Sequence, residues 1–100
     1  MDSSPVFKRV QAAEGFLQLG MPEDAWNELE EIEPELRHLP QVILLRVLIF
    51  NALKRWEAAA VVGHGALERY PELGDLYLAT AYAARRFRSI VASESGSPGR

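Results

Sequence analysis

The sequence contains no cysteine among its 100 residues. This absence excludes disulfide bonds, thiolate zinc sites and cysteine nucleophiles, and it suits a reducing compartment. Histidine is scarce as well, because only His38 and His64 are present, and neither has the spacing to a second ligand that a helical zinc site needs. Neither histidine has a serine nearby in a nucleophile-elbow context. We therefore expect no catalytic residue, no metal and no cofactor, and we do not expect an enzyme.

Long hydrophobic runs and an excess of positive charge are also missing. The longest apolar run, residues 42–53, is interrupted by Arg46 and Asn51 and is far shorter than the ~20 residues that cross a bilayer. The first residues include Asp2 and contain no apolar run of signal-peptide length. The formal net charge is −3, whereas a nucleic-acid-binding surface is basic. We expect a cytoplasmic protein with neither a membrane nor a nucleic-acid partner.

Apolar residues recur at helical spacing through most of the chain. Ser3, Ser4 and Pro5 predict a helix start, and Gly20 predicts its end. The pattern predicts a second helix from Pro22, which Pro34 cuts short. Further helices are expected from Pro40 to a tight turn at residues 54–55, from there to Tyr70–Pro71, and from Leu76 to about Arg86.

The sequence repeats itself at a period of 34 residues, and two positions separated by this period are described below as one repeat apart. Phe16 then coincides with Phe50, and Ala25 coincides with Ala59. Three copies coincide at two further places, which hold Leu19, Leu53 and Phe87, and Ala13, Val47 and Ala81. A helix–turn–helix unit of this length is typical of helical repeat arrays.

The pattern resembles that of the tetratricopeptide repeat (TPR) family over about residues 5–88. That family keeps small residues where helices touch and a proline at the end of the unit, and Ala25, Ala59 and Pro71 match these places. The resemblance implies an all-α fold of antiparallel helix–turn–helix repeats, a TPR-like α-solenoid of about five helices. We expect one repeat domain over residues 1–88, with units at about 6–39, 40–73 and 74–88. Residues 89–100 are rich in serine and glycine and are expected to be a disordered tail.

TPR arrays are mostly scaffolds that bind peptides or partner proteins in a concave groove lined by the first helix of each unit. The chaperone-binding members use a clamp of lysine, asparagine and arginine for a terminal carboxylate. The matching places here hold Val10, Glu14, Leu45, Asp75 and Ala79, so the clamp is absent. The resemblance implies that the partner groove is lined by Val10, Leu17, Leu44, Leu48, Asn51, Leu78, Tyr82 and Arg85.

Six of these groove residues form an apolar strip, and an exposed strip of this kind marks an interaction site. The plainer alternative is that the same residues are core. We favour a scaffold or adaptor whose groove binds an apolar or amphipathic segment of a protein or peptide. The alternative function is a self-associating protein, such as a homodimer, whose groove is filled by another copy. The incomplete third unit favours cover by another molecule, because repeat units bury their faces only against neighbours.

Two glycines inside one predicted helix, in Gly63–His64–Gly65, are the oddest local feature. Each costs about 1 kcal/mol relative to alanine in a helix interior. Gly63 stands where the TPR family places a bulky aromatic residue. One explanation is a close approach of another helix or a ligand. We favour the other, in which Gly63 makes room for a large neighbour such as Trp56 or Tyr77.

Overall fold

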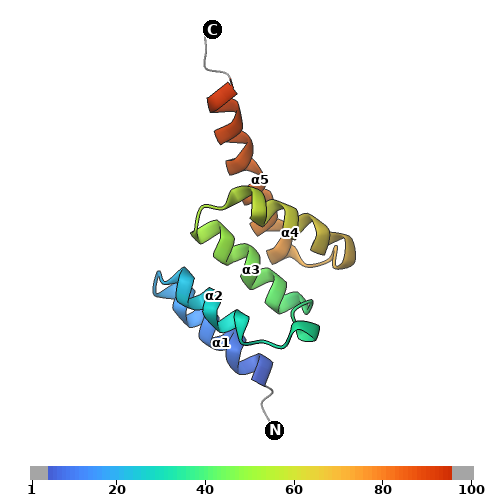
Figure 1. The fold of residues 1–100 in the computed structure, drawn as a ribbon. Helices are drawn as coiled ribbons and strands as arrows, with labels where there is room; N and C mark the ends of the chain where they lie inside the picture. The colour runs from blue at the N-terminus through green and yellow to red at the C-terminus, as the bar shows by residue number, and fades with distance from the viewer. Residues whose placement is uncertain (1–4, 96–100) are drawn as a thin grey trace.

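The computed structural model describes residues 5–95, which form five α-helices and one short 3₁₀ helix (Figure 1). The all-α fold of about five helices predicted from the sequence is therefore confirmed. Proline opens three of the α-helices and the 3₁₀ helix, as its missing amide hydrogen and fixed φ favour at a first helical position. The elements are α1 (Pro5–Gln18), α2 (Pro22–Glu30), η1 (Pro34–Leu36), α3 (Pro40–Ala52), α4 (Trp56–Arg69) and α5 (Gly74–Ser95).

Helices α1 and α2 form a first hairpin, α3 and α4 form a second, and α5 packs on α3 and α4. The turns of the two hairpins contain equivalent backbone hydrogen bonds, whose donors and acceptors lie one repeat apart in the sequence. Met21 N donates to Phe16 O at 2.8 Å, and Arg55 N donates to Phe50 O at the same distance. The residue before each donor has a left-handed backbone, which is Gly20 (φ 76°) in the first turn and Lys54 (φ 63°) in the second. The repeat in the sequence thus corresponds to a repeated helix-ending geometry.

Two clusters of buried side chains form the core, and α3 contributes to both. Val42, Leu45 and Ile49 pack with α1 and α2, whereas Ile43 and Val47 pack with α4 and α5. The central helix is therefore apolar nearly all round because it has neighbours on two sides. Positions one repeat apart are buried alike: Val42 and Leu76, Ala25 and Ala59, Ala13 and Val47, and Ile49 and Ala83 are all 0% exposed.

Helix α5 packs closely against α4 at Gly63. A Cβ built on Gly63 would lie 2.8 Å from the Cβ and the Cγ2 of Thr80, and closer still to its Oγ1. No side chain fits in this space, because real Cβ atoms do not approach other atoms so closely. The favoured prediction named the wrong neighbour: the space at Gly63 is taken by the side chain of Thr80 and not by Trp56 or Tyr77, and α5 lies close to α4 there.

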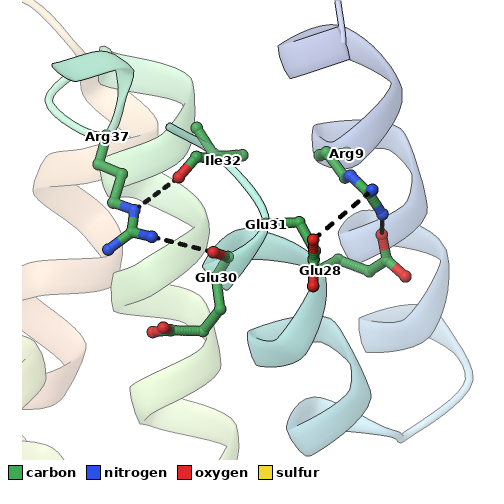
Figure 2. Close-up of polar contacts among 6 residues, drawn as sticks. All are labelled: Arg9, Glu28, Glu30, Glu31, Ile32 and Arg37. Carbon is green, nitrogen blue, oxygen red and sulfur yellow. Dashed lines mark hydrogen bonds and ion pairs between the residues drawn. The ribbon is translucent and has the colours of Figure 1, made fainter. Parts of the chain in front are cut away.

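Charged side chains join the parts of the first hairpin (Figure 2). Arg9 of α1 forms an ion pair with Glu28 of α2 at 2.8 Å, and its other terminal nitrogen lies 3.9 Å from Glu31. Past the end of α2, Arg37 donates from Nε to Ile32 O at 2.8 Å and from Nη2 to Glu30 O at 2.9 Å. Arg37 thus satisfies carbonyl groups that the end of a helix leaves without partners.

Helix α5 is longer than the sequence predicted. It continues to Ser95, so residues 89–95 are helical and the prediction of a disordered tail is wrong for them; residues 96–100 lie outside the described residues. Trp56, the first residue of α4, lies beside Tyr82 and Arg86, and the last part of α5 projects past the other helices (Figure 1). The predicted serine N-cap of α1 also lies outside the described residues. None of the helices between residues 5 and 95 combines the length and the apolar character needed to cross a membrane.

Candidate functional site

An apolar groove lies between α3 and α5, with a volume of about 460 Å³. Five of the eight groove residues predicted from the sequence line it together. Asp75 and Ala79 of α5 complete the lining. The five predicted residues are Leu44, Leu48 and Asn51 from α3, and Leu78 and Tyr82 from α5.

Helical spacing explains why these side chains share one groove. Residues three or four apart lie on the same side of a helix, and Asp75, Leu78 and Tyr82 follow this spacing along α5. The apolar side chains here are not core: Leu48 is 37% exposed, Leu78 is 65% exposed and Tyr82 is 43% exposed. The plainer alternative, in which the apolar strip is buried, does not hold for this part of the strip.

The ring of Tyr82 is positioned by Trp56, the first residue of α4. Their centroids are 5.6 Å apart with the rings nearly perpendicular, an edge-to-face geometry that aromatic pairs favour. The guanidinium of Arg86 lies over the other ring of this pair, 5.1 Å from the centroid of Trp56. The groove therefore has one firmly packed aromatic wall.

Asn51 joins the two helices at the bottom of the groove. Its Nδ2 donates to Ala79 O at 3.2 Å, which connects α3 to α5 through a single amide. Its Oδ1 is buried and has no hydrogen-bond partner among the described residues. The side chain predicted as a groove residue is thus half-buried and also holds the groove's two helices together.

Charged residues lie at both ends of the groove. A neighbouring hollow shares Leu44 and Asp75 with the groove and extends it past Glu72 to the first residues of α3 and α5. At the opposite end, Arg85 is exposed one turn beyond Tyr82 on the same side of α5. The groove therefore runs from an acidic end to a basic end, with apolar side chains between.

Two predicted groove residues in the first hairpin lie elsewhere. Val10 is 6% exposed and belongs to the core between α1, α2 and α3. Leu17 is half-buried and packs against that same core. Arg85 is a third predicted residue that does not line the groove itself, although it lies at its end. The apolar groove is therefore lined by α3 and α5 alone, without the first hairpin.

A second hollow, which sequence reasoning missed, lies between η1, α3 and α4. Its volume is about 450 Å³, and its cationic or titratable lining residues are Arg37, His38, Arg46 and Arg69. It uses Ile43 and Arg46 of α3, whereas the groove uses Leu44, Leu48 and Asn51, so the two sites lie on different sides of that helix. We call this second site the basic hollow.

Within the described part of the chain, no three His, Cys, Asp or Glu side chains come together as metal ligands would. Comparisons of the chain with protein-family models, with curated proteins and with solved structures find no match.

Proposed function

We propose that this chain is a TPR-type helical repeat module that binds an apolar or amphipathic segment of a partner protein in the groove between α3 and α5. The observation that carries the proposal is the exposure of Leu48, Leu78 and Tyr82 along one groove. The TPR assignment is supported by the repeated turn geometry at Gly20 and Lys54. The proposal gives the chain no catalytic role.

The energetic argument follows from the exposed apolar surface. Covering the apolar side chains of the groove favours association by ~25 cal/mol per Å² of apolar surface removed from water, and this gain must exceed the entropy lost when two molecules associate. The packing of Tyr82 against Trp56 holds one wall of the groove in place before binding, which lowers the entropy lost on association. An open apolar groove of this kind suits a helical or extended segment with apolar side chains at regular spacing.

The charges at the groove's ends define the partner's chemistry further. Asp75 and Glu72 favour a basic residue at one end of the bound segment, and Arg85 favours an acidic residue at the other. Charge of this kind fixes the direction of the segment more than it raises affinity. The proposed ligand is therefore an apolar stretch flanked by a cation on one side and an anion on the other.

The test begins with a selection of random dodecapeptides that bind the purified chain. The affinity of the selected peptides is then measured by calorimetry for the wild type, for Leu78→Asp and for Val61→Asp. Leu78→Asp places a carboxylate in the groove, and Val61→Asp is its matched control, because both residues are 65% exposed and Val61 lies outside the groove. We expect apolar peptides that bind wild type and Val61→Asp equally and lose at least about ten-fold in affinity for Leu78→Asp.

Two results would contradict the proposal. The first is a set of selected peptides with no apolar consensus. The second is equal binding of the selected peptides to Leu78→Asp and to wild type.

A second candidate function is self-association, and the projecting end of α5 favours it. Ile90 is 41% exposed and Val91 is 44% exposed on this end, which therefore carries two exposed apolar side chains on a helical segment that is otherwise rich in serine. A second copy would supply the segment. Sedimentation velocity decides between the two, because a monomer at high micromolar concentration excludes self-association, whereas a dimer lost in both Leu78→Asp and Ile90→Asp supports it.

A further inference from the structure

The basic hollow gathers arginine side chains from three elements, and His38 lines it as well. Arg37 and His38 come from the η1 region, Arg46 from α3 and Arg69 from the last turn of α4. None of the described residues that line it is acidic. Like charges brought together in this way repel each other unless an anion lies between them.

The equivalent place in the first hairpin has its own anions. A shift of one repeat relates Glu28 to Val62 and Glu31 to Gly65. In the first hairpin Arg9 forms a hydrogen-bonded ion pair with Glu28 and lies 3.9 Å from Glu31 (Figure 2), and the position equivalent to Arg9 in the second hairpin is Ile43. In the second hairpin Val62 and Gly65 line the basic hollow, so the chain supplies no carboxylate where the first hairpin has two.

Gly65 adds an independent observation. A Cβ on Gly65 would meet nothing within 4 Å, whereas one on Gly63 would collide with Thr80. Packing therefore explains Gly63 and does not explain Gly65, although glycine is unfavourable in a helix interior. Gly65 is exposed and lines the basic hollow, where it contributes no side chain.

Two of the arginines are held in place before any ligand arrives. Arg37 donates from Nε and Nη2 to the carbonyls of Ile32 and Glu30, and its Nη1 makes neither of these bonds. The guanidinium of Arg46 lies 5.8 Å from the ring centroid of Trp26. The acidic residue Glu30 lines a smaller hollow that shares Arg37 and Arg46 with the basic hollow. Preorganised guanidinium groups favour phosphate, whose oxygens match their planar donors.

We propose that the basic hollow binds a phosphate group, whether a monoester or the free anion, through Arg37, Arg46 and Arg69, with Gly65 leaving room for its oxygens. The proposal is independent of the groove, because the two sites use different sides of α3. A phosphate monoester carries close to two negative charges at neutral pH, which the three arginines offset. The phosphate could belong to a phosphorylated side chain or to free phosphate, and the experiment below separates the two.

The test is calorimetry with two probes, inorganic phosphate and a capped, otherwise uncharged peptide containing one phosphoserine, at pH 7.5 and low ionic strength. Gly65→Glu restores the carboxylate of the first hairpin, and Gly65→Ala adds a methyl group alone. Arg69→Gln removes one cation of the hollow, and Arg88→Gln is the matched control, because Arg88 is an exposed arginine of α5 outside the hollow.

We expect Arg69→Gln to weaken phosphate binding about ten-fold, the value of one charge-assisted hydrogen bond, and Arg88→Gln to leave it unchanged. Gly65→Glu should abolish binding, and Gly65→Ala should weaken it while raising the melting temperature. Tighter binding of the phosphopeptide than of inorganic phosphate assigns the site to a phosphorylated chain, and equal binding assigns it to free phosphate. No binding of either probe at millimolar concentration, or equal weakening by Arg69→Gln and Arg88→Gln, would overturn the proposal.

Discussion

The two hairpins share their turns and differ in how each packs on the helix that follows it. In the first, Leu29 of α2 is 4% exposed and fills the core beside α3. In the second, the equivalent position is Gly63, and α5 approaches it so closely that no Cβ fits. The same position of the two hairpins can therefore pack against the following helix either with a large side chain, as at Leu29, or with a glycine that has none, as at Gly63. The first solution should be sensitive to lost atoms and the second to added ones.

Of the substitutions that test this comparison, Leu29→Ala should lower the free energy of unfolding the most. Truncating a buried leucine leaves a cavity, and we expect a loss of about 3 kcal/mol in the free energy of unfolding. Urea unfolding followed by circular dichroism measures it. Leu19→Ala is the control, because Leu19 is 72% exposed, and it should change stability by less than about 0.5 kcal/mol. Equal effects of the two substitutions would show that Leu29 does not close the first hairpin.

Gly63→Ala tests whether the second hairpin is destabilised by added atoms. The added Cβ collides with Thr80, so α4 and α5 must separate, and we expect a loss of about 2 kcal/mol. Gly65→Ala is the matched control in the same helix; with open space at its Cβ, it should gain about 0.8 kcal/mol from helix propensity. A double-mutant cycle with Thr80→Gly should recover most of the loss at Gly63. Gains at both glycines would contradict the close approach.

Sequence reasoning located most of the fold because the repeat period carries local information. The turn at Gly20 and the turn at Lys54 are specified by nearby residues, so both could be read from the pattern. The contact of Gly63 with Thr80 could not, because it depends on how α5 approaches α4. The end of α5 was also missed: serine-rich composition suggested a tail at Ser89, yet no glycine or proline interrupts the helix before Ser95.

The candidate site was predictable only in part, for a related reason. The helical spacing of Leu44, Leu48 and Leu78 places them on equivalent faces of α3 and α5, and the structure brings them together. The burial of Val10 depends on how α1 is rotated against α3, which spacing does not determine. The sequence did contain a sign of the basic hollow. The position one repeat after Glu31 is Gly65, so the second hairpin lacks a carboxylate that the first hairpin has.

Thr80→Val should stabilise the contact between α5 and Gly63 in the second hairpin. The Oγ1 of Thr80 is buried against Gly63 and has no hydrogen-bond partner among the described residues. Replacing a buried hydroxyl without a partner by a methyl group of similar shape should raise the free energy of unfolding by about 1 kcal/mol. Thermal unfolding measures the change. A loss of stability would mean that the hydroxyl has a favourable interaction in solution.

Arg9→Gln should change the free energy of unfolding the least. It removes the ion pair with Glu28, where the second hairpin has Ile43 and Val62 at the equivalent positions. The Arg9 side chain is 42% exposed, so solvent screens the pair and we expect a loss of no more than about 0.5 kcal/mol. Urea unfolding at low and at high salt measures it, and the difference between wild type and variant should shrink at high salt. A loss that is independent of salt would contradict an electrostatic role.

The most direct test of the central claim is an amide chemical-shift map of the ¹⁵N-labelled chain on addition of a peptide selected for binding. Binding in the groove predicts that the largest shifts fall on α3 and α5, around Leu44, Leu48, Leu78 and Tyr82, with the amides of α1 and α2 little changed. Largest shifts in the first hairpin, or in the end of α5 beyond Arg86, would contradict the assignment of the groove as the binding site.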